Sequence, residues 1–130
     1  MNSIETNNMW YFRAVTDEDD DDYTGDSVML PVDQITGIAP QGSTISIFFK
    51  GNNLSQTPST LTRNKIISLT YTAGYGKEVC EHLASLANAG PHHGGVTVVA
   101  DDVTTDFDGT TRNAIYSHKY INGVHSIRNA

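Results

Sequence analysis

Short runs in which apolar and polar residues alternate recur along the chain. They predict β-strands, because successive side chains of a strand point to opposite faces. Ile45, Ile47 and Phe49 share one face of such a run, and Ile67, Leu69 and Tyr71 share one face of another. Strands are predicted for residues 9–15, 28–30, 35–39, 44–50, 65–72 and 95–100, with a last strand or two between residues 113 and 127.

Residues 77–88 have the spacing of an amphipathic helix instead. Their apolar stripe consists of Val79, Cys80, Leu83, Ala84, Leu86 and Ala87. Three of the larger members recur at i, i+4 and i+7, which places them on one side of a helix. Gly90 and Pro91 follow and are typical of the end of a helix.

Turn-forming residues separate these elements. Residues 41–43, Gln-Gly-Ser, lie between two predicted strands and indicate a hairpin. Pro31 cannot donate to a sheet, so its strand is expected at an edge or a bend. Asn122-Gly123 predicts a turn between the last strands. Residues 51–64 and 101–112 are expected to be polar loops.

The predicted fold is α+β: a mostly antiparallel β-sheet or small sandwich with one amphipathic helix packed on it. The 130 residues suit a single β-rich domain over residues 9–130. It carries a polar leader over residues 1–8 and an acidic loop over residues 16–26. We expect no signal peptide and no membrane span, because no apolar run is long enough. The single cysteine, Cys80, cannot form an internal disulfide.

The net charge of −7 is concentrated in one segment. Residues 17–22 hold six of the 15 acidic residues, which leaves nine acidic residues against eight basic ones in the rest of the chain. The lysines and arginines are scattered. This pattern argues against binding to nucleic acid or to an anionic membrane, both of which need clustered positive charge.

The acidic run is expected to be a solvated loop, because its like charges repel one another. Two alternatives remain open. Asp17, Asp19 and Asp21 could share one side and bind calcium, although contiguous acids do not have the spacing of a calcium loop. The run could instead dock on a basic patch of a partner.

Three further groups contain residue types that can carry out chemistry. His92, His93, Asp101 and Asp102 are the residues that a metal-dependent hydrolase would use, but adjacent histidines rarely share one metal. Cys80 is expected to be a buried apolar residue, since His82 is two positions away and points elsewhere. Gly74-Tyr75-Gly76-Lys77 lies between a strand and a helix but lacks the fixed positions of a phosphate loop.

No nucleophile motif, pair of general acids or dinucleotide fingerprint is present in the sequence. The sequence therefore predicts a protein that is not an enzyme, with no cofactor and no catalytic, cofactor-binding or metal-binding residues. His118 and His125 also lack the spacing of metal ligands.

Four segments together resemble small virion structural proteins of marine tailed phages such as cyanophages. They are MWYFRAVTDEDDDD, VDQITGIAPQGSTISIFFK, KIISLTYTAGYGKEVCEHLASLAN and GVTVVADDVT, and the resemblance covers most of residues 9–127. The leader and the long loop over residues 51–64 are not part of it. These motifs are structural, so the resemblance implies no site residues.

The resemblance implies a capsid decoration or cement protein located in the virion and assembled in the host cytoplasm. Such a protein binds the shell exterior, contacts the major capsid protein or other virion proteins, and is expected to form a homo-oligomer. Exposed apolar residues such as Tyr11, Tyr23 or Phe48 would form the contacts. A tail or head–tail accessory protein, and a small cytoplasmic binding module outside the virion, are the alternatives.

Overall fold

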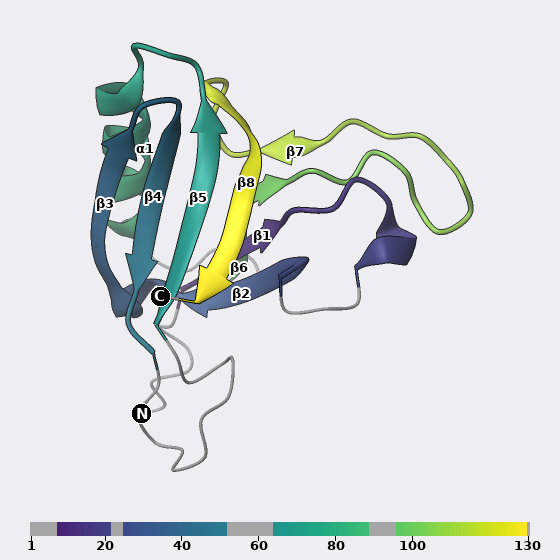
Figure 1. Cartoon of the computed structure of the whole chain (residues 1–130), viewed down its shortest axis with the longest axis horizontal. Helices are drawn as coiled ribbons and strands as arrows, with labels where there is room; N and C mark the ends of the chain where they lie inside the picture. The colour runs from purple at the N-terminus through teal and green to yellow at the C-terminus, as the bar shows by residue number, and fades with distance from the viewer. Residues whose placement is uncertain (1–7, 22–24, 52–63, 89–95, 130) are drawn as a thin grey trace.

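A computed structural model describes residues 8–21, 25–51, 64–88 and 96–129 (Figure 1). The strands are β1 (Met9–Arg13), β2 (Ser27–Pro31), β3 (Ile35–Gln41), β4 (Thr44–Phe49), β5 (Lys65–Tyr71), β6 (Val96–Asp101), β7 (Ile115–Tyr116) and β8 (Ile121–Asn129). The helix is α1 (Gly76–Asn88), and Glu18–Asp20 and Val32–Gln34 form short 3₁₀ turns. None of the described helices is long and apolar enough to cross a bilayer.

The strands form two four-stranded sheets. The first sheet has the order β2-β1-β6-β7, and the second has the order β3-β4-β5-β8. All neighbouring strands are antiparallel except β1 and β6, which are parallel. Figure 1 shows α1 behind β3 and β4, on the side of the second sheet where β1 and β6 also lie. The predicted α+β fold, mostly antiparallel with one packed helix, is confirmed.

The core lies between the second sheet on one side and α1 and the first sheet on the other. It contains the inward side chains that the alternation predicts, among them Ile45, Ile47, Phe49, Ile67, Leu69 and Tyr71. The first sheet contributes Trp10 and Phe12, and the helix contributes Val79 and Leu83; each of these four side chains is fully buried. Ala84 is exposed, so the apolar stripe of the helix is narrower than predicted.

The hairpin of β3 and β4 forms as predicted. Gly42 has a φ of 72°, a left-handed conformation that glycine adopts without a steric penalty. The Tyr71 hydroxyl donates a hydrogen bond to the Gly42 carbonyl at 2.9 Å and fixes the turn against β5. Pro31 ends β2, which is an edge strand of the first sheet, also as predicted.

Two predictions near the C-terminus are wrong. Asn122-Gly123 is not a turn, because both residues lie inside β8; the chain turns earlier, where the Ile121 N–H donates to the His118 carbonyl. Residues 101–112 are not an open loop, since Asp101 belongs to β6 and Val103 is fully buried. Both errors arise because long-range pairing with β5 and β1 outweighs the local turn signal.

Gly123 is required by close packing rather than by a turn. A Cβ atom at this position would lie 3.1 Å from Thr70 Oγ1 and 3.5 Å from Asp102 Oδ1. The first distance is shorter than ordinary van der Waals contact. A Cβ atom on Gly123 would therefore require the Thr70 side chain to move by a few tenths of an ångström.

We predict that Gly123→Ala lowers the free energy of unfolding by about 1–3 kcal/mol through overpacking. Urea denaturation followed by circular dichroism measures this loss. Gly37→Ala is the matched control, because its Cβ would meet only Phe48 Cδ2 at 3.9 Å. Equal stability of the two variants would contradict the packing argument.

Candidate functional site on an acidic arm

Two segments project together from one side of the sheets. Figure 1 shows the chain after β1 beside the connection from β6 to β7. We call residues 14–21 and 102–114 the arm. Backbone hydrogen bonds join the two segments: the Thr104 N–H donates to the Thr16 carbonyl at 2.8 Å, and the Glu18 N–H donates to the Thr105 carbonyl at 2.9 Å. The arm is therefore a paired structure, not two separate loops.

The short side chains of the acidic run shape its local structure. The Asp17 carboxylate accepts the Asp19 N–H at 3.0 Å and caps the 3₁₀ turn over Glu18–Asp20. At the end of the arm, the Gly109 N–H donates to the Asp106 carbonyl at 2.9 Å. Gly109 has a φ of 83°, so glycine suits this tight turn.

A network of ion pairs anchors the arm to the first sheet. Its centre is Asp101, whose side chain is 5% exposed. Asp101 Oδ1 lies 3.4 Å from Arg13 Nε, and Asp101 Oδ2 lies 3.0 Å from Arg112 Nη2. The Val103 N–H also donates to Asp101 Oδ1 at 3.0 Å. One buried carboxylate thus contacts both Arg13 at the end of β1 and Arg112 of the arm.

The two arginines extend the network into the acidic residues of the arm. Arg13 lies 3.3 Å from Glu18 Oε2 and 3.5 Å from Asp21 Oδ2. Arg112 Nε lies 3.3 Å from Asp106 Oδ1. Burial opposes the charge of Arg13, but the combined effect of Asp101, Tyr11 and Glu18 outweighs burial and raises the pKa of the guanidinium.

This network corrects the prediction of a fully solvated acidic loop. Asp19 and Asp20 are exposed, whereas the Glu18 and Asp21 side chains are only 23% and 19% exposed. A calcium ion would have to share these carboxylates with the cationic Arg13 group. In the described ranges, no three His, Cys, Asp or Glu side chains converge as metal ligands would.

Asp101 and Asp102 serve different partners, because consecutive residues point to opposite sides of a strand. Asp102 accepts a hydrogen bond from the Tyr116 hydroxyl at 2.7 Å and from the Val124 N–H at 3.1 Å. Burial and this carboxylate raise the pKa of Tyr116. The hydrolase hypothesis also used His92 and His93, which lie outside the described residues.

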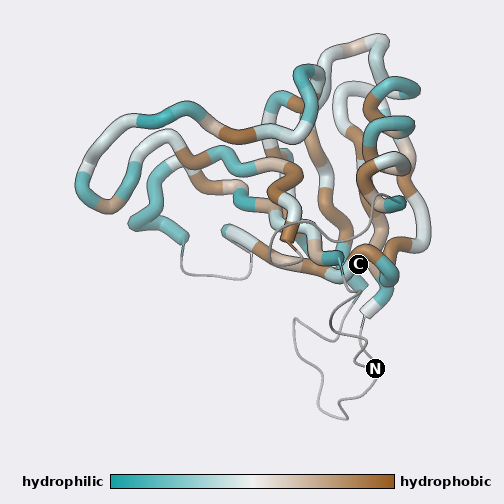
Figure 2. Tube along the Cα trace, turned by 180° about the vertical axis from the view of Figure 1, so that it is seen from behind, coloured by the Kyte–Doolittle hydropathy of each residue, from teal (hydrophilic) through white to brown (hydrophobic). Residues whose placement is uncertain are grey.

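The end of the arm presents an apolar side chain within an acidic surface. Phe107 is 70% exposed, and its backbone N–H donates to Glu18 Oε1 at 3.1 Å. Its neighbours in the chain are Asp106 and Asp108. Figure 2 shows mostly hydrophilic residues along the end of the arm. An exposed aromatic ring in an acidic segment is suited to contact with another protein.

The contact residues predicted from the sequence are Tyr11, Tyr23 and Phe48. Tyr11 and Phe48 are half-buried, and Tyr23 lies outside the described residues. The large apolar side chains that the structure shows as exposed are Met29, Tyr75, Phe107 and Ile115. The prediction of a polar loop over residues 101–112 does not indicate Phe107 as a contact residue. Its signal in the sequence is a single aromatic residue within the turn Asp-Phe-Asp-Gly.

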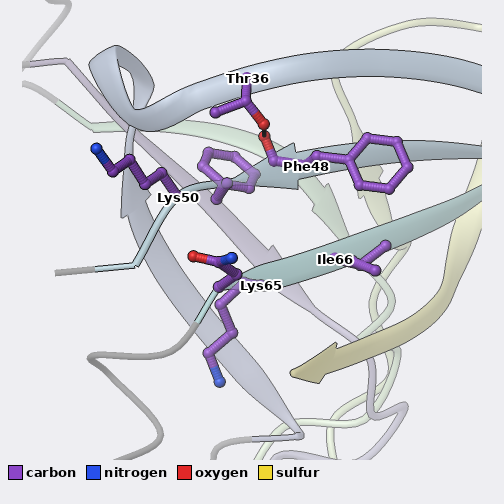
Figure 3. A pocket seen from close by; sticks show the side chains of 7 residues that line it. Thr36, Phe48, Lys50, Lys65 and Ile66 are labelled. Atoms are coloured by element: carbon purple, nitrogen blue, oxygen red, sulfur yellow. Dashed lines mark hydrogen bonds between the residues drawn. The ribbon is translucent and has the colours of Figure 1, made fainter. Parts of the chain in front are cut away.

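A second candidate is a pocket of about 180 Å³ at one end of β4 and β5 (Figure 3). It is lined by Thr36, Phe48, Phe49, Lys50, Asn64, Lys65 and Ile66. Burial lowers the pKa of Lys65. However, Figure 3 shows the Lys50 and Lys65 ammonium groups pointing away from each other, so the pocket does not concentrate positive charge on an anion. The arm is the better candidate site.

The remaining candidates have structural roles. Cys80 packs partly buried against the core, and burial raises the pKa of its thiol. His82 contacts Ser117 on another element. The ring of Tyr75, in the glycine-rich turn, stacks on the ring of Tyr120 with 3.8 Å between the ring centroids. Lys77, in the same segment, is exposed.

Comparison with known proteins finds no matching family model, no matching curated protein and no matching solved structure.

We predict that Asp101→Asn lowers the free energy of unfolding by about 3 kcal/mol, because it leaves Arg13 and Arg112 without their shared buried counter-ion. Thermal and urea denaturation measure this loss. Asp108→Asn is the matched control, since Asp108 is exposed at the end of the arm. A loss as small as that of the control would mean that the network does not anchor the arm.

Proposed function

We propose that this chain is a virion structural protein, a capsid decoration or cement protein that binds the major capsid protein at the shell exterior. The arm is its contact with the shell. The resemblance to small virion proteins of marine tailed phages supports the location. The exposure and anchoring of Phe107 support the mode of binding.

Phe107 is the observation that carries this proposal. Aromatic side chains dominate the binding energy of many protein interfaces when they enter a pocket on the partner. Phe107 is 70% exposed, while the backbone around it is held by Glu18 and by the turn from Asp106 to Thr110. Because the arm is already ordered, binding loses little conformational entropy.

The charge of the arm defines the surface that it fits. Carboxylates of Asp19, Asp106 and Asp108 lie near the end of the arm, so a complementary partner has an apolar pocket bordered by lysine or arginine. Opposite charges speed association and exclude acidic surfaces. On a symmetric shell, many copies with modest individual affinity hold adjacent subunits together through multivalency.

We predict that Phe107→Ala weakens binding to shells that lack this protein by at least about tenfold, as expected for an aromatic interface anchor. Co-sedimentation of the purified protein with such shells at increasing concentration measures the affinity. Met29→Ala is the matched control, because Met29 is also exposed but lies on β2, outside the arm. Binding should also weaken as salt increases.

Co-sedimentation, heat resistance and mass spectrometry together separate the alternatives. Shells decorated with this protein should resist heat better than undecorated shells. Binding that Phe107→Ala and Met29→Ala reduce equally would contradict docking through the arm.

Mass spectrometry of purified virions gives the copy number: about six or twelve copies would indicate the symmetric tail axis. Absence from virions would indicate a binding module that does not enter the particle.

A further inference from the structure

The end of the arm has a definite chemical character that a partner must match. Phe107 is 70% exposed and stands next to the exposed Asp108 in the chain. Asp19 and Asp20 are also exposed, and they follow Glu18, whose carboxylate accepts the Phe107 N–H. A complementary surface therefore combines an apolar pocket with positive charge at its border.

The pocket at one end of β4 and β5 has the shape and polarity that this ring needs. Phe48, Phe49 and Ile66 provide its apolar lining, and its volume is about 180 Å³. A protein cavity of about 150 Å³ with an apolar lining takes up benzene, so this pocket is large enough for one phenyl ring. Thr36 and Lys50, which also line it, are exposed, which indicates that it opens to solvent (Figure 3).

Two lysines give the pocket its positive charge. Lys50 is exposed and Lys65 is only 4% exposed, and among the described residues neither of them forms an ion pair. Their ammonium groups point in different directions, so they suit two separate carboxylates better than one small anion (Figure 3). An acidic segment that approaches the pocket would also offset the cost of burying the unpaired Lys65.

The ring and the pocket of one chain are too far apart to meet. Figure 1 shows the arm projecting away from the end of β4 and the start of β5, where the pocket lies. The ion pairs of Asp101 with Arg13 and Arg112 hold the arm to the first sheet, so it does not fold back onto the second. The ring of one copy can therefore enter only the pocket of another copy.

We propose that this chain associates head to tail, with Phe107 of one copy inserted into the pocket of the next copy at the end of β4 and β5. The carboxylates beside the ring approach Lys50 and Lys65 of that copy. Because the two surfaces differ, the contact is heterologous, and each added copy presents a free arm and a free pocket.

The association uses the arm of the proposed function but takes place in the free protein and needs no shell. A capsid protein that binds Phe107 would compete with the second copy for the same ring. This competition, unlike the self-association, rests on the proposed function. Each arm would then bind either a second copy or the shell.

Sedimentation velocity of the purified protein over a range of concentrations, without shells, tests the head-to-tail contact. We expect the average mass to rise above that of one chain as the concentration increases, and to fall as added salt screens the charges. Phe107→Ala and Lys50→Glu should each raise the dissociation constant at least about tenfold, through loss of the aromatic anchor and reversal of a charge at the pocket. A wild-type chain that stays monomeric at millimolar concentration would overturn the proposal.

Met29→Ala and Lys77→Glu are the matched controls. The first truncates an exposed apolar side chain and the second reverses an exposed lysine, and both positions lie outside the arm and the pocket. Both variants should associate like the wild type. An equal loss of association in a control and in its matched variant would overturn the proposal.

A mixture of the two defective variants separates a head-to-tail contact from contact between identical patches. Phe107→Ala keeps an intact pocket and Lys50→Glu keeps an intact arm, and circular dichroism first establishes that both are folded. Their equimolar mixture should form a dimer with nearly wild-type affinity and no larger species, because the remaining arm and pocket of that dimer are both defective. A mixture that associates no better than either variant alone would overturn the proposal.

Shell binding by the same variants distinguishes this contact from the proposed function. Lys50→Glu keeps the arm intact and should still co-sediment with shells. Shell binding that requires Phe107, in a chain that stays monomeric in solution, would overturn the head-to-tail contact alone. Self-association without any binding to shells would overturn the proposed function alone.

Discussion

Two adjacent carboxylates at the end of β6 connect the parts of this molecule. Asp101 faces Arg13 and Arg112 and anchors the arm, whereas Asp102 faces the Val124 N–H and the Tyr116 hydroxyl and connects the first sheet to β8. A buried carboxylate is costly unless charges and hydrogen bonds surround it. The buried Asp101 meets this condition through two arginines and the Val103 N–H, and the partly buried Asp102 accepts hydrogen bonds from Tyr116 and Val124. Each carboxylate thereby connects a different segment to the same end of β6.

The order of the arm follows from this constraint. Without Arg13 and Arg112, the carboxylates of residues 17–21 would repel one another and favour an extended, solvated chain. With them, the segment pairs with residues 102–106 and supports the turn that presents Phe107. A surface that is both acidic and ordered can discriminate among partners by charge and still bind without a large loss of entropy.

Two arginines and one buried carboxylate anchor the arm to the first sheet. The anchoring of the arm depends on Arg13 and Arg112, which stay charged at any physiological pH. It also depends on Asp101, which is buried and contacts both arginines.

Much of the framework could be predicted from the sequence. Alternation in residues 44–50 and 65–72, the stripe around Val79 and Leu83, and the edge position of Pro31 are local patterns, and local geometry fixes which face each side chain takes. The predicted boundaries agree with the structure within one or two residues for most of these elements. Tertiary structure alone decided the parallel pairing of β1 with β6, the place of Gly123 inside β8, and the burial of Asp101 between two arginines. Each of these depends on groups distant in the chain, about 88 positions apart for Arg13 and Asp101, whose interaction energy appears only once the fold brings them together.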